Sequence, residues 1–306
     1  MSLPQGIAVQ CSDSAVRVAL DAWLAGLRLS VPTPLVLKVE VSEQVSAPLG
    51  ETLFEQPEVR FGPGPNGRGV RIVWDHAPAL AELPAGATVA SVRLSPNAVA
   101  RLDRCTRTFL LAVVILLLRR AGWYHLHAAT AIDPGGQGWL FTGNAHVGKS
   151  TTAALLATSG WQVGTDDAAF LERVADRILV HTAHAPIALR EGGRRLLAKA
   201  GGIVLPDRGK VGFWPEDLGA VWTPLVSPDI VIFPTVGRTR TTAQPIARAE
   251  ALAELVRWSA WVMLEPDLAQ AHLDVLTQLA GQARCYRVTL GRDLFARPNR
   301  LIELVT

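Results

Sequence analysis

Cysteine is scarce in this sequence of 306 residues. Only three cysteines are present, Cys11, Cys105 and Cys285, and they lie far apart with no Cys-x-x-Cys pair. An odd number of scattered cysteines argues against a disulfide framework, and the missing pair argues against a cysteine zinc site. The N-terminus also lacks a basic stretch followed by an apolar run and a small-residue cleavage site, so the sequence indicates no signal peptide. We expect a cytoplasmic protein.

Long hydrophobic runs and an excess of one charge are missing as well. The most apolar stretch covers residues 109–118 and is followed by Arg119 and Arg120. A membrane-spanning helix takes ~20 apolar residues, so this stretch is typical of a buried helix instead. The 30 lysines and arginines stand against 27 aspartates and glutamates, which gives a net charge of +3. This balance gives no reason to expect a nucleic-acid or membrane partner, and a site for phosphates would account for it equally well.

The first 96 residues alternate apolar and polar side chains. This alternation predicts half-buried strands at 35–41, 70–74 and 89–94. Apolar residues at helical spacing predict a helix over residues 13–29, with Ser12 or Asp13 as its cap. No catalytic constellation is present in this part. We expect residues 1–96 to form a small α+β domain, with substrate docking as a candidate role.

Residues 97–306 are expected to form a second, larger domain of mixed α/β structure. Hydrophobic periodicity and turn residues predict a long helix over 97–121, strands at 123–129, 139–142 and 229–233, and helices at 247–263 and 266–283. A hairpin turn at 135–138 separates the first two of these strands. The predicted fold class is therefore α/β, a mixed sheet with flanking helices, preceded by the small α+β domain.

The sequence GNAHVGKS fits the phosphate-loop pattern G-x-x-x-x-G-K-[ST] at every fixed position, between an apolar strand and a helix. Glycines let backbone amides face an anion, and the helix N-terminus adds partial positive charge. Lys149 would reach the β- and γ-phosphates, and the Ser150 hydroxyl would bind Mg²⁺. The alternative is a chance match in a strand–turn–helix. The residues predicted to bind the nucleotide, ATP, are Gly143, Asn144, Ala145, His146, Val147, Gly148, Lys149, Ser150 and Thr151.

Two adjacent acids follow only one helix after this loop. A short apolar stretch, 161–165, leads directly into Asp166 and Asp167. An apolar strand that ends in acid can aim a carboxylate at Mg²⁺, and two acids allow one to bind the metal while the other lies near an acceptor hydroxyl. A turn or a helix cap is the alternative, because aspartate is common in both.

A pair of histidines lies on the strand before the loop. His125 and His127 alternate, so both side chains share one face of that strand. A histidine in a strand is usually a packed core or edge residue. The position of His127 one hairpin before the phosphate loop makes it a candidate site residue.

Together these residues resemble the HPr kinase/phosphorylase superfamily. Its members carry a histidine on the strand before the phosphate loop and an Asp-Asp pair on the next strand. They phosphorylate a serine hydroxyl on a small protein, and their core resembles that of phosphoenolpyruvate carboxykinase. The resemblance covers residues 123–195 and implies an ATP-dependent kinase that uses Mg²⁺, with an oligomer as a further implication.

The resemblance also implies roles for individual residues. Asp166 would be the catalytic base, oriented or charge-balanced by His127, and Lys149 would act on the transferring phosphate. Asp167 would help Ser150 to hold the metal. A glutamate downstream of the acids corresponds to Glu191, although the order of Glu and Arg around it differs from the HPr kinase pattern. That difference puts HPr itself and a reverse phosphorylase activity in doubt.

The N-terminal part does not resemble the regulatory domain of HPr kinases. It is similar in length to the HPr kinase-like enzymes that phosphorylate peptide natural-product precursors, lasso peptides among them. The predicted function is therefore phosphoryl transfer from ATP to a serine or threonine hydroxyl on a peptide or small protein. The alternatives are a kinase of HPr or of a small molecule on the same core, and a nucleotide-binding regulator without catalysis. The cations that could assist the transfer, which the sequence does not rank, are Arg190, Arg194, Arg195, Arg208 and Lys210.

Overall fold

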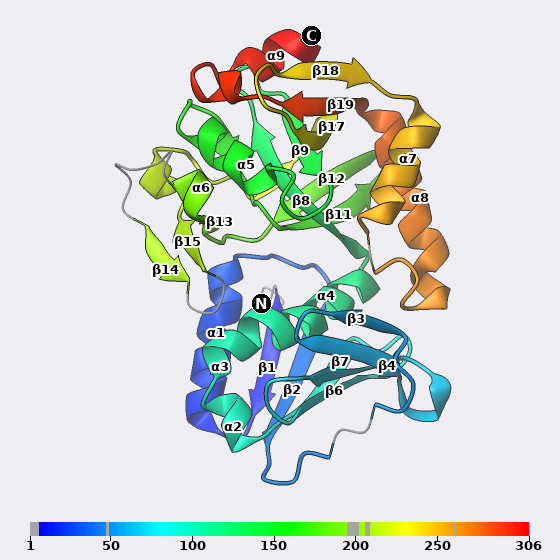
Figure 1. The fold of residues 1–306 in the computed structure, drawn as a ribbon. Helices are drawn as coiled ribbons and strands as arrows, with labels where there is room; N and C mark the ends of the chain where they lie inside the picture. Colours follow the sequence, from blue (N-terminus) through cyan, green and yellow to red (C-terminus); the bar gives the residue numbers. More distant parts are fainter. Residues whose placement is uncertain (1–5, 47–48, 195–201, 206–208, 260, 306) are drawn as a thin grey trace. The chain divides into compact units, whose positions relative to one another are not determined.

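The computed structural model describes residues 6–46, 49–194, 202–205, 209–259 and 261–305. The chain separates into two compact units (Figure 1). Unit 1 comprises Met1–Tyr124 and Trp261–Gln270, and unit 2 comprises His125–Ala260 and Ala271–Thr306.

Unit 1 is built on one seven-stranded sheet in the order β1-β2-β7-β6-β5-β4-β3. Its first three strands run parallel, and the other neighbours are antiparallel. The strands are β1 (Ile7–Cys11), β2 (Leu35–Val41), β3 (Phe54–Gln56), β4 (Val59–Pro63), β5 (Val70–Trp74), β6 (Ala79–Leu83) and β7 (Val89–Leu94). A short helical turn, η1, covers Pro65–Gly67. The three strands predicted from alternation are confirmed as β2, β5 and β7.

Helix α1 (Ser14–Leu27) confirms the helix predicted near the N-terminus. Its start is fixed by Asp13, whose carboxylate accepts hydrogen bonds from the amides of Ala15 and Val16, each 3.0 Å long. The helix ends at Arg28, which takes a left-handed conformation with φ 52°. Of the two caps considered from the sequence, Asp13 is the one that the structure uses.

The helix predicted over 97–121 is interrupted. The chain forms α2 (Pro96–Val99), α3 (Leu102–Cys105), a π-helical segment η2 (Thr106–Leu110) and α4 (Leu111–Arg120). The first break falls at Arg101, where φ −119° and ψ 31° leave the helical range. The apolar stretch of the sequence is buried in η2 and α4. None of the helices among the described residues is both long and apolar enough to cross a membrane.

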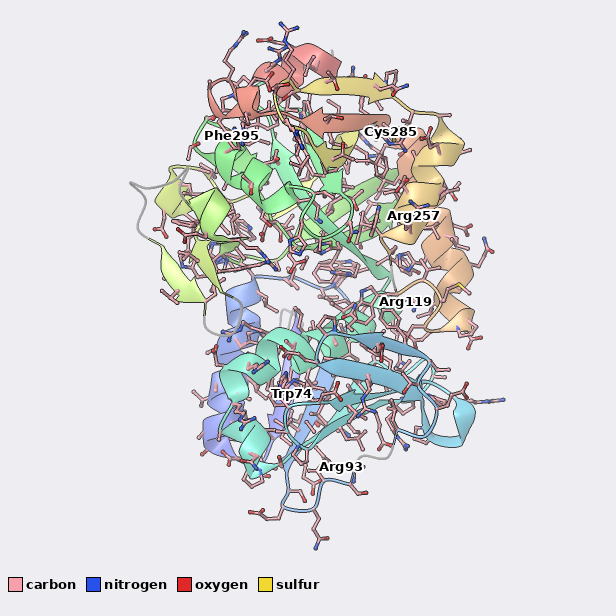
Figure 2. The ribbon with its side chains drawn as sticks, viewed as in Figure 1. Trp74, Arg93, Arg119, Arg257, Cys285 and Phe295 are labelled. Atoms are coloured by element: carbon pink, nitrogen blue, oxygen red, sulfur yellow. The ribbon has the colours of Figure 1, made fainter. Side chains whose placement is uncertain are left out.

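These helices belong to unit 1, so the contacts divide the chain after Tyr124, whereas the sequence placed the boundary at residue 96. Two arginines at the end of α4 explain why residues 261–270 join the same unit. Arg119 is buried and donates to the carbonyl of Val262 at 2.8 Å (Figure 2). Arg120 donates to Glu265 Oε1 at 2.6 Å and also binds backbone carbonyls of the β6–β7 turn.

Unit 2 contains a nine-stranded mixed sheet in the order β16-β12-β11-β8-β9-β17-β19-β18, with β10 paired to β8. Its strands are β8 (Trp123–Ile132), β9 (Gly138–Thr142), β10 (Gln162–Val163), β11 (Ala168–Val174), β12 (Arg177–Thr182), β16 (Leu225–Val226), β17 (Pro228–Val236), β18 (Thr242–Pro245) and β19 (Arg284–Leu290). β9, β17 and β19 are parallel neighbours. A three-stranded sheet adds β13 (Ile187–Leu189), β15 (Lys210–Phe213) and β14 (Ile203–Leu205).

The helices of unit 2 flank the large sheet. They are α5 (Lys149–Ala157), α6 (Glu191–Arg194), η4 (Glu216–Leu218), α7 (Arg248–Arg257), α8 (Pro266–Gln282), whose first residues count with unit 1, η5 (Arg292–Phe295) and α9 (Arg300–Val305). Apolar residues of α5 and α9 pack in one core with residues of β8, β9, β17 and β19, among them Trp139 and Ile232. Helix α7 is shorter than the predicted 247–263 helix, and α8 confirms the 266–283 helix. The predicted α/β class with mixed sheets and flanking helices is confirmed.

Candidate functional site

The phosphate-loop sequence lies between a strand and a helix, as predicted. β9 ends at Thr142 and α5 begins at Lys149, so residues 143–148 form the loop. Gly148 is the residue before the helix and has φ +96°, a backbone conformation that residues other than glycine rarely adopt. A Cβ atom there would also lie 3.1 Å from Leu290 Cδ1. This position therefore requires glycine, because only glycine permits both the turn and the close approach.

His146 has an unusual backbone for a residue with a side chain. It lies in the loop with φ +70°. Residues other than glycine adopt such angles in only a few per cent of cases, although histidine is among the enriched types. The strained conformation keeps the backbone path that a glycine would give and adds an imidazole at the wall of the cavity.

Lys149 is folded back onto the loop that it follows. Its ammonium donates to the carbonyl oxygens of Gly143, at 2.7 Å, and Asn144, at 2.9 Å. Only 5% of the residue is exposed, and this burial lowers the pKa of the Lys149 ammonium to about 8. Anionic oxygens in the loop would favour the charged form of this lysine.

Backbone hydrogen bonds to β8 hold Asp166 and Asp167 close to the start of the phosphate loop. β8 and β9 form an antiparallel hairpin in which Ala128 lies opposite Thr142, next to the start of the loop. On its other side β8 pairs with β10, and the pairing continues beyond that short strand. Thr130 N donates to Thr165 O at 2.9 Å, and Ala128 N donates to Asp167 O at 3.3 Å. The acids and His127 therefore lie side by side, although 39 positions separate Ala128 from Asp167 (167 − 128).

Gly164 allows this close pairing of the two chain segments. A Cβ atom at this position would lie 2.4 Å from Thr130 Oγ1 and 2.5 Å from Thr182 Cγ2. No side chain fits in that space. The glycine before Thr165 is thus a requirement for bringing the acids against β8.

Asp166 is the buried member of the acid pair, with 6% of its surface exposed. Its Oδ2 accepts a hydrogen bond from Ala188 N at 3.1 Å, and the Ser150 hydroxyl also bonds to this carboxylate. Burial and then the charge of Asp167 raise the pKa of the Asp166 carboxyl from 3.8 to about 6. The buried acid thus faces the hydroxyl that a phosphate loop offers to a metal ion.

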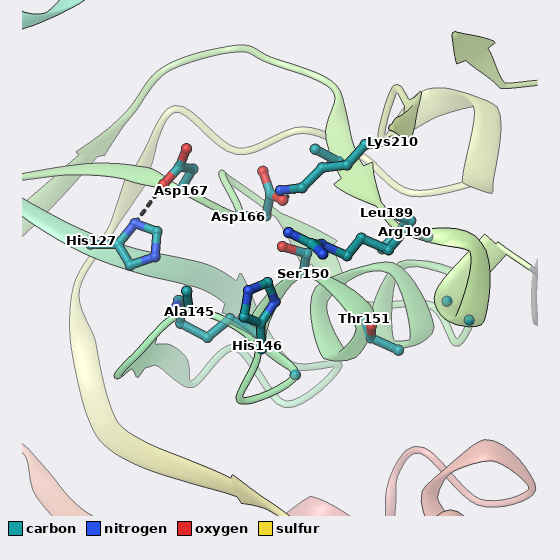
Figure 3. Close-up of a pocket in the computed structure, with 15 residues that line it drawn as sticks. His127, Ala145, His146, Ser150, Thr151, Asp166, Asp167, Leu189, Arg190 and Lys210 are labelled. Carbon is teal, nitrogen blue, oxygen red and sulfur yellow. Dashed lines mark hydrogen bonds and ion pairs between the residues drawn. The ribbon is translucent and has the colours of Figure 1, made fainter. Parts of the chain in front are cut away.

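Asp167 is the exposed member and pairs with His127. His127 Nδ1 lies 2.5 Å from Asp167 Oδ1, and the two side chains are 39% and 52% exposed (Figure 3). The resemblance implied that His127 orients or charge-balances Asp166, whereas in the structure His127 is paired with Asp167. The reason is the backbone bond from Ala128 to Asp167, which places the second acid next to the histidine.

His125, the other histidine of the pair, lies away from this site. Its ring contacts Phe170 with an edge-to-face geometry and a centroid distance of 5.7 Å. Burial lowers the pKa of His125 well below its usual range. This side chain is a packed residue of the strand.

A cavity of about 270 Å³ joins these groups. Figure 3 shows the side chains of Ser150, Asp166, Arg190 and Lys210 converging in it. The described residues that line it are His127, Ala145, His146, Gly148, Lys149, Ser150, Thr151, Asp166, Asp167, Ala188, Leu189, Arg190, Gly192, Gly193 and Lys210. Three predicted loop residues, Gly143, Asn144 and Val147, are not part of this lining. The first two contribute carbonyl groups to Lys149 instead.

Glu191, the predicted third metal ligand, does not join the two aspartates. It is the exposed first residue of α6. Its neighbours Arg190, Gly192 and Gly193 line the cavity and Glu191 does not, among the residues that the structure describes. The segment approaches the loop through Gly193, where a Cβ atom would lie 3.1 Å from Thr151 Oγ1.

Of the five basic residues that the sequence offered as helpers of the transfer, two line the cavity. Arg190 follows β13 and Lys210 begins β15, and antiparallel pairing of these strands sets Leu189 opposite Val211. Both cations therefore arrive at one wall of the cavity from the ends of paired strands. Sequence reasoning did not single out Lys210 because no local motif marks it. The side chain of Arg194 and the residues Arg195 and Arg208 lie outside the described part of the chain.

The amide of Ala188 is the other functional group that sequence reasoning missed. It holds the buried carboxylate of Asp166 through a backbone donor, which no side-chain motif can indicate. The assembled site offers loop amides and three cations to an anion, oxygen ligands to a hard cation, and a carboxylate–imidazole pair near solvent.

No family model matches this sequence, and no curated protein matches it. Among solved structures, the chain is similar to the HPr(Ser) kinase/phosphatase from Coxiella burnetii, with 14% sequence identity and a TM-score of 0.31. The match covers 58% of this chain and 93% of that chain. A likeness this distant says nothing about activity, so the function follows from the site alone.

Proposed function

We propose that this chain is an ATP-dependent kinase that transfers the γ-phosphoryl group to a serine or threonine hydroxyl of a peptide or small protein. The His127–Asp167 pair and the phosphate loop line the same cavity, so a proton acceptor and a phosphate site face each other. A regulator that only holds a nucleotide has no use for that pair.

The phosphates would bind to the loop amides and the start of α5. Lys149 would exchange its two carbonyl partners for phosphate oxygens, and Arg190 and Lys210 would offset charge on the transferring group. Fixed donors and cations around the transferring group supply most of the acceleration in phosphoryl transfer.

Mg²⁺ fits the oxygen groups beside the loop. Mg²⁺ is usually held by one or two carboxylates together with substrate phosphates, and keeps several waters. The Ser150 hydroxyl and the Asp166 carboxylate are hydrogen-bonded to each other and would hold the ion. When bound, it would neutralise phosphate charge. A dication beside Asp166 would favour the charged form of this carboxyl, which burial disfavours in the absence of the ion.

Asp167 would accept the proton of the acceptor hydroxyl, with His127 as its positioning partner. This assignment exchanges the roles that the resemblance implied for the two acids. It rests on the 2.5 Å contact between His127 and Asp167, and on the burial of Asp166 against Ser150. Acid–base assistance of this kind is typically worth ~10²–10⁴ in rate.

The exposure of the pair supports a large acceptor. Asp167 is 52% exposed, so a hydroxyl on a peptide can approach it from solvent. A small-molecule acceptor would more often be enclosed, since such sites bury most of their ligand. We extend the proposal to precursors of ribosomal peptide natural products, as the sequence resemblance implies. A short precursor gene beside this gene would support the extension.

Incubation with radiolabelled ATP, Mg²⁺ and a random serine/threonine peptide library tests the proposal. We expect label that is stable to acid and released by base, as for phosphoserine. Asp167→Asn should lower incorporation by ~10²-fold or more, whereas Asp176→Asn, at an exposed acid outside the cavity, should not. If the wild type does not bind ATP, the proposed function is refuted. If Asp167→Asn incorporates as much label as the wild type, Asp167 is not the base.

A further inference from the structure

A second cavity of about 370 Å³ adjoins the phosphate cavity. Both cavities are lined by His146, Gly148, Thr151, Gly192 and Gly193. The second cavity extends along α5 to Leu155, one turn beyond Thr151. Neither aspartate of the site lines it among the described residues. It therefore leads away from the groups that would handle the transferred phosphate.

The topology of the large sheet explains where this cavity lies. β9, β17 and β19 are parallel neighbours, so their carboxyl ends meet at one edge. The phosphate loop follows β9, and the other two strands end in Val236 and Leu290, which are paired with each other. Ligands of open α/β sheets bind outside the carboxyl ends of such strands. The second cavity occupies this edge beside the phosphate loop.

The walls of the cavity combine apolar and cationic side chains. Leu155, Leu290 and Leu294 contribute apolar surface. Val236 and Phe295 are also in the lining and remain 66% and 43% exposed. Arg238 and Arg292 bring two guanidinium groups. A flat aromatic base can stack on a phenyl ring or on a guanidinium plane, and its apolar faces would cover the exposed side chains.

Hydrogen bonds join the loop after β17 (residues 237–241) to the end of β19 and the residues after it (290–293) without a ligand. Asp293 accepts from the Thr241 hydroxyl at 2.6 Å and from the Thr241 amide at 2.9 Å. The same hydroxyl accepts from Gly291 N at 3.0 Å, and Gly237 N donates to Leu290 O at 2.8 Å. The cavity is thus preformed, as small-molecule sites usually are.

We infer that this second cavity binds the nucleoside of the nucleotide, with the base between Phe295 and the arginines Arg238 and Arg292. The inference rests on the proposed function, because the phosphates must lie in the loop. It gives the nucleotide one direction: the nucleoside lies toward η5 and the γ-phosphate lies toward Asp167. The acceptor must then approach from the side of His127 and Asp167.

Calorimetry with Mg·ATP and with magnesium tripolyphosphate tests this inference. Tripolyphosphate has the phosphates and lacks the nucleoside, so it reports on the loop alone. For wild type we expect ATP to bind more tightly than tripolyphosphate. Phe295→Ala should weaken ATP about tenfold, which is the usual effect of losing one base–aromatic stack, and leave tripolyphosphate unchanged.

Arg292→Ala should act in the same way, and Arg297→Ala is its matched control. Arg297 is on the same segment, is exposed and pairs with Glu303 instead of lining the cavity. If Phe295→Ala and Arg292→Ala leave the ratio of ATP to tripolyphosphate affinity unchanged, the nucleoside lies elsewhere, although the loop assignment stands. If wild type binds neither compound, the proposed function fails and this inference fails with it.

Discussion

The buried carboxyl of Asp166 should make the folding stability of the protein depend on pH. Burial and the charge of Asp167 raise its pKa from 3.8 to about 6. Below pH 3.8 the folded and the unfolded chain both hold the proton, so this group leaves stability unchanged. Between the two values the unfolded chain ionises first, and stability falls as pH rises. Above about pH 6 the full penalty applies, and a pKa rise of about 2 at 1.36 kcal/mol per pKa unit corresponds to about 3 kcal/mol.

Asp166→Asn removes this penalty while it keeps the shape of the side chain. The ligand-free variant should therefore be up to about 3 kcal/mol more stable than wild type at pH 8. At pH 3.5 the two proteins should be equally stable. Urea unfolding between these pH values measures the difference, and the transition of unit 2 is the one that should shift. Asp176→Asn is the control, since Asp176 is an exposed acid on the turn between β11 and β12.

Mg·ATP should reverse the order of stability. The ion favours the charged carboxylate, so wild type gains more stability from the ligand than the variant does. A variant that is no more stable than wild type at pH 8 would refute the reasoning, because the carboxyl would then carry no penalty. If Mg·ATP stabilises both proteins by the same amount, Asp166 does not bind the metal ion.

Two further changes test the loop and the proton acceptor. Gly148→Ala should abolish tripolyphosphate binding and destabilise the protein by about 1–2 kcal/mol, because φ is +96° and Leu290 is close. Gly160→Ala has similar strain with open space, so it should lose stability and keep binding; equal binding by both variants would contradict the loop geometry. His127→Ala and Asp167→Asn should each lower turnover strongly, and the double variant should be no worse than Asp167→Asn. Additive losses in this cycle would mean that the two side chains act separately.

Much of the fold follows from local patterns in the sequence. Alternation predicted β2, β5 and β7, and the cap of the first helix was predicted to be Ser12 or Asp13, of which Asp13 is used. The phosphate loop was recognisable because its glycines and lysine are close together in sequence. Each of these features depends on neighbouring residues, which is why sequence alone is sufficient for them.

The arrangement of the acids depended on a contact between distant segments. No local pattern indicates which aspartate meets His127, because the hydrogen bond from Ala128 N to Asp167 O decides it. The place of Lys210 depends on the pairing of β13 with β15. The second cavity depends on the pairing of β17 with β19, which brings Val236 and Leu290 together.

The boundary between the units was placed differently for a similar reason. The alternation of apolar and polar residues ends near residue 96, shortly after the predicted strand at 89–94. Helix α4, which follows, is buried along most of its length and belongs to unit 1, where Arg119 and Arg120 bind residues at and near Glu265. Periodicity predicts that such a segment is a helix, and it contains no information on which sheet the helix covers.

Crystals grown with Mn²⁺ and a non-hydrolysable ATP analogue would show which acid binds the metal ion. Anomalous scattering locates Mn²⁺ without ambiguity. We expect the ion within ligand distance of the Ser150 hydroxyl and the Asp166 carboxylate, with the phosphates on residues 143–150. An ion held by Asp167 and away from Asp166, or a triphosphate bound outside the loop, would contradict this expectation.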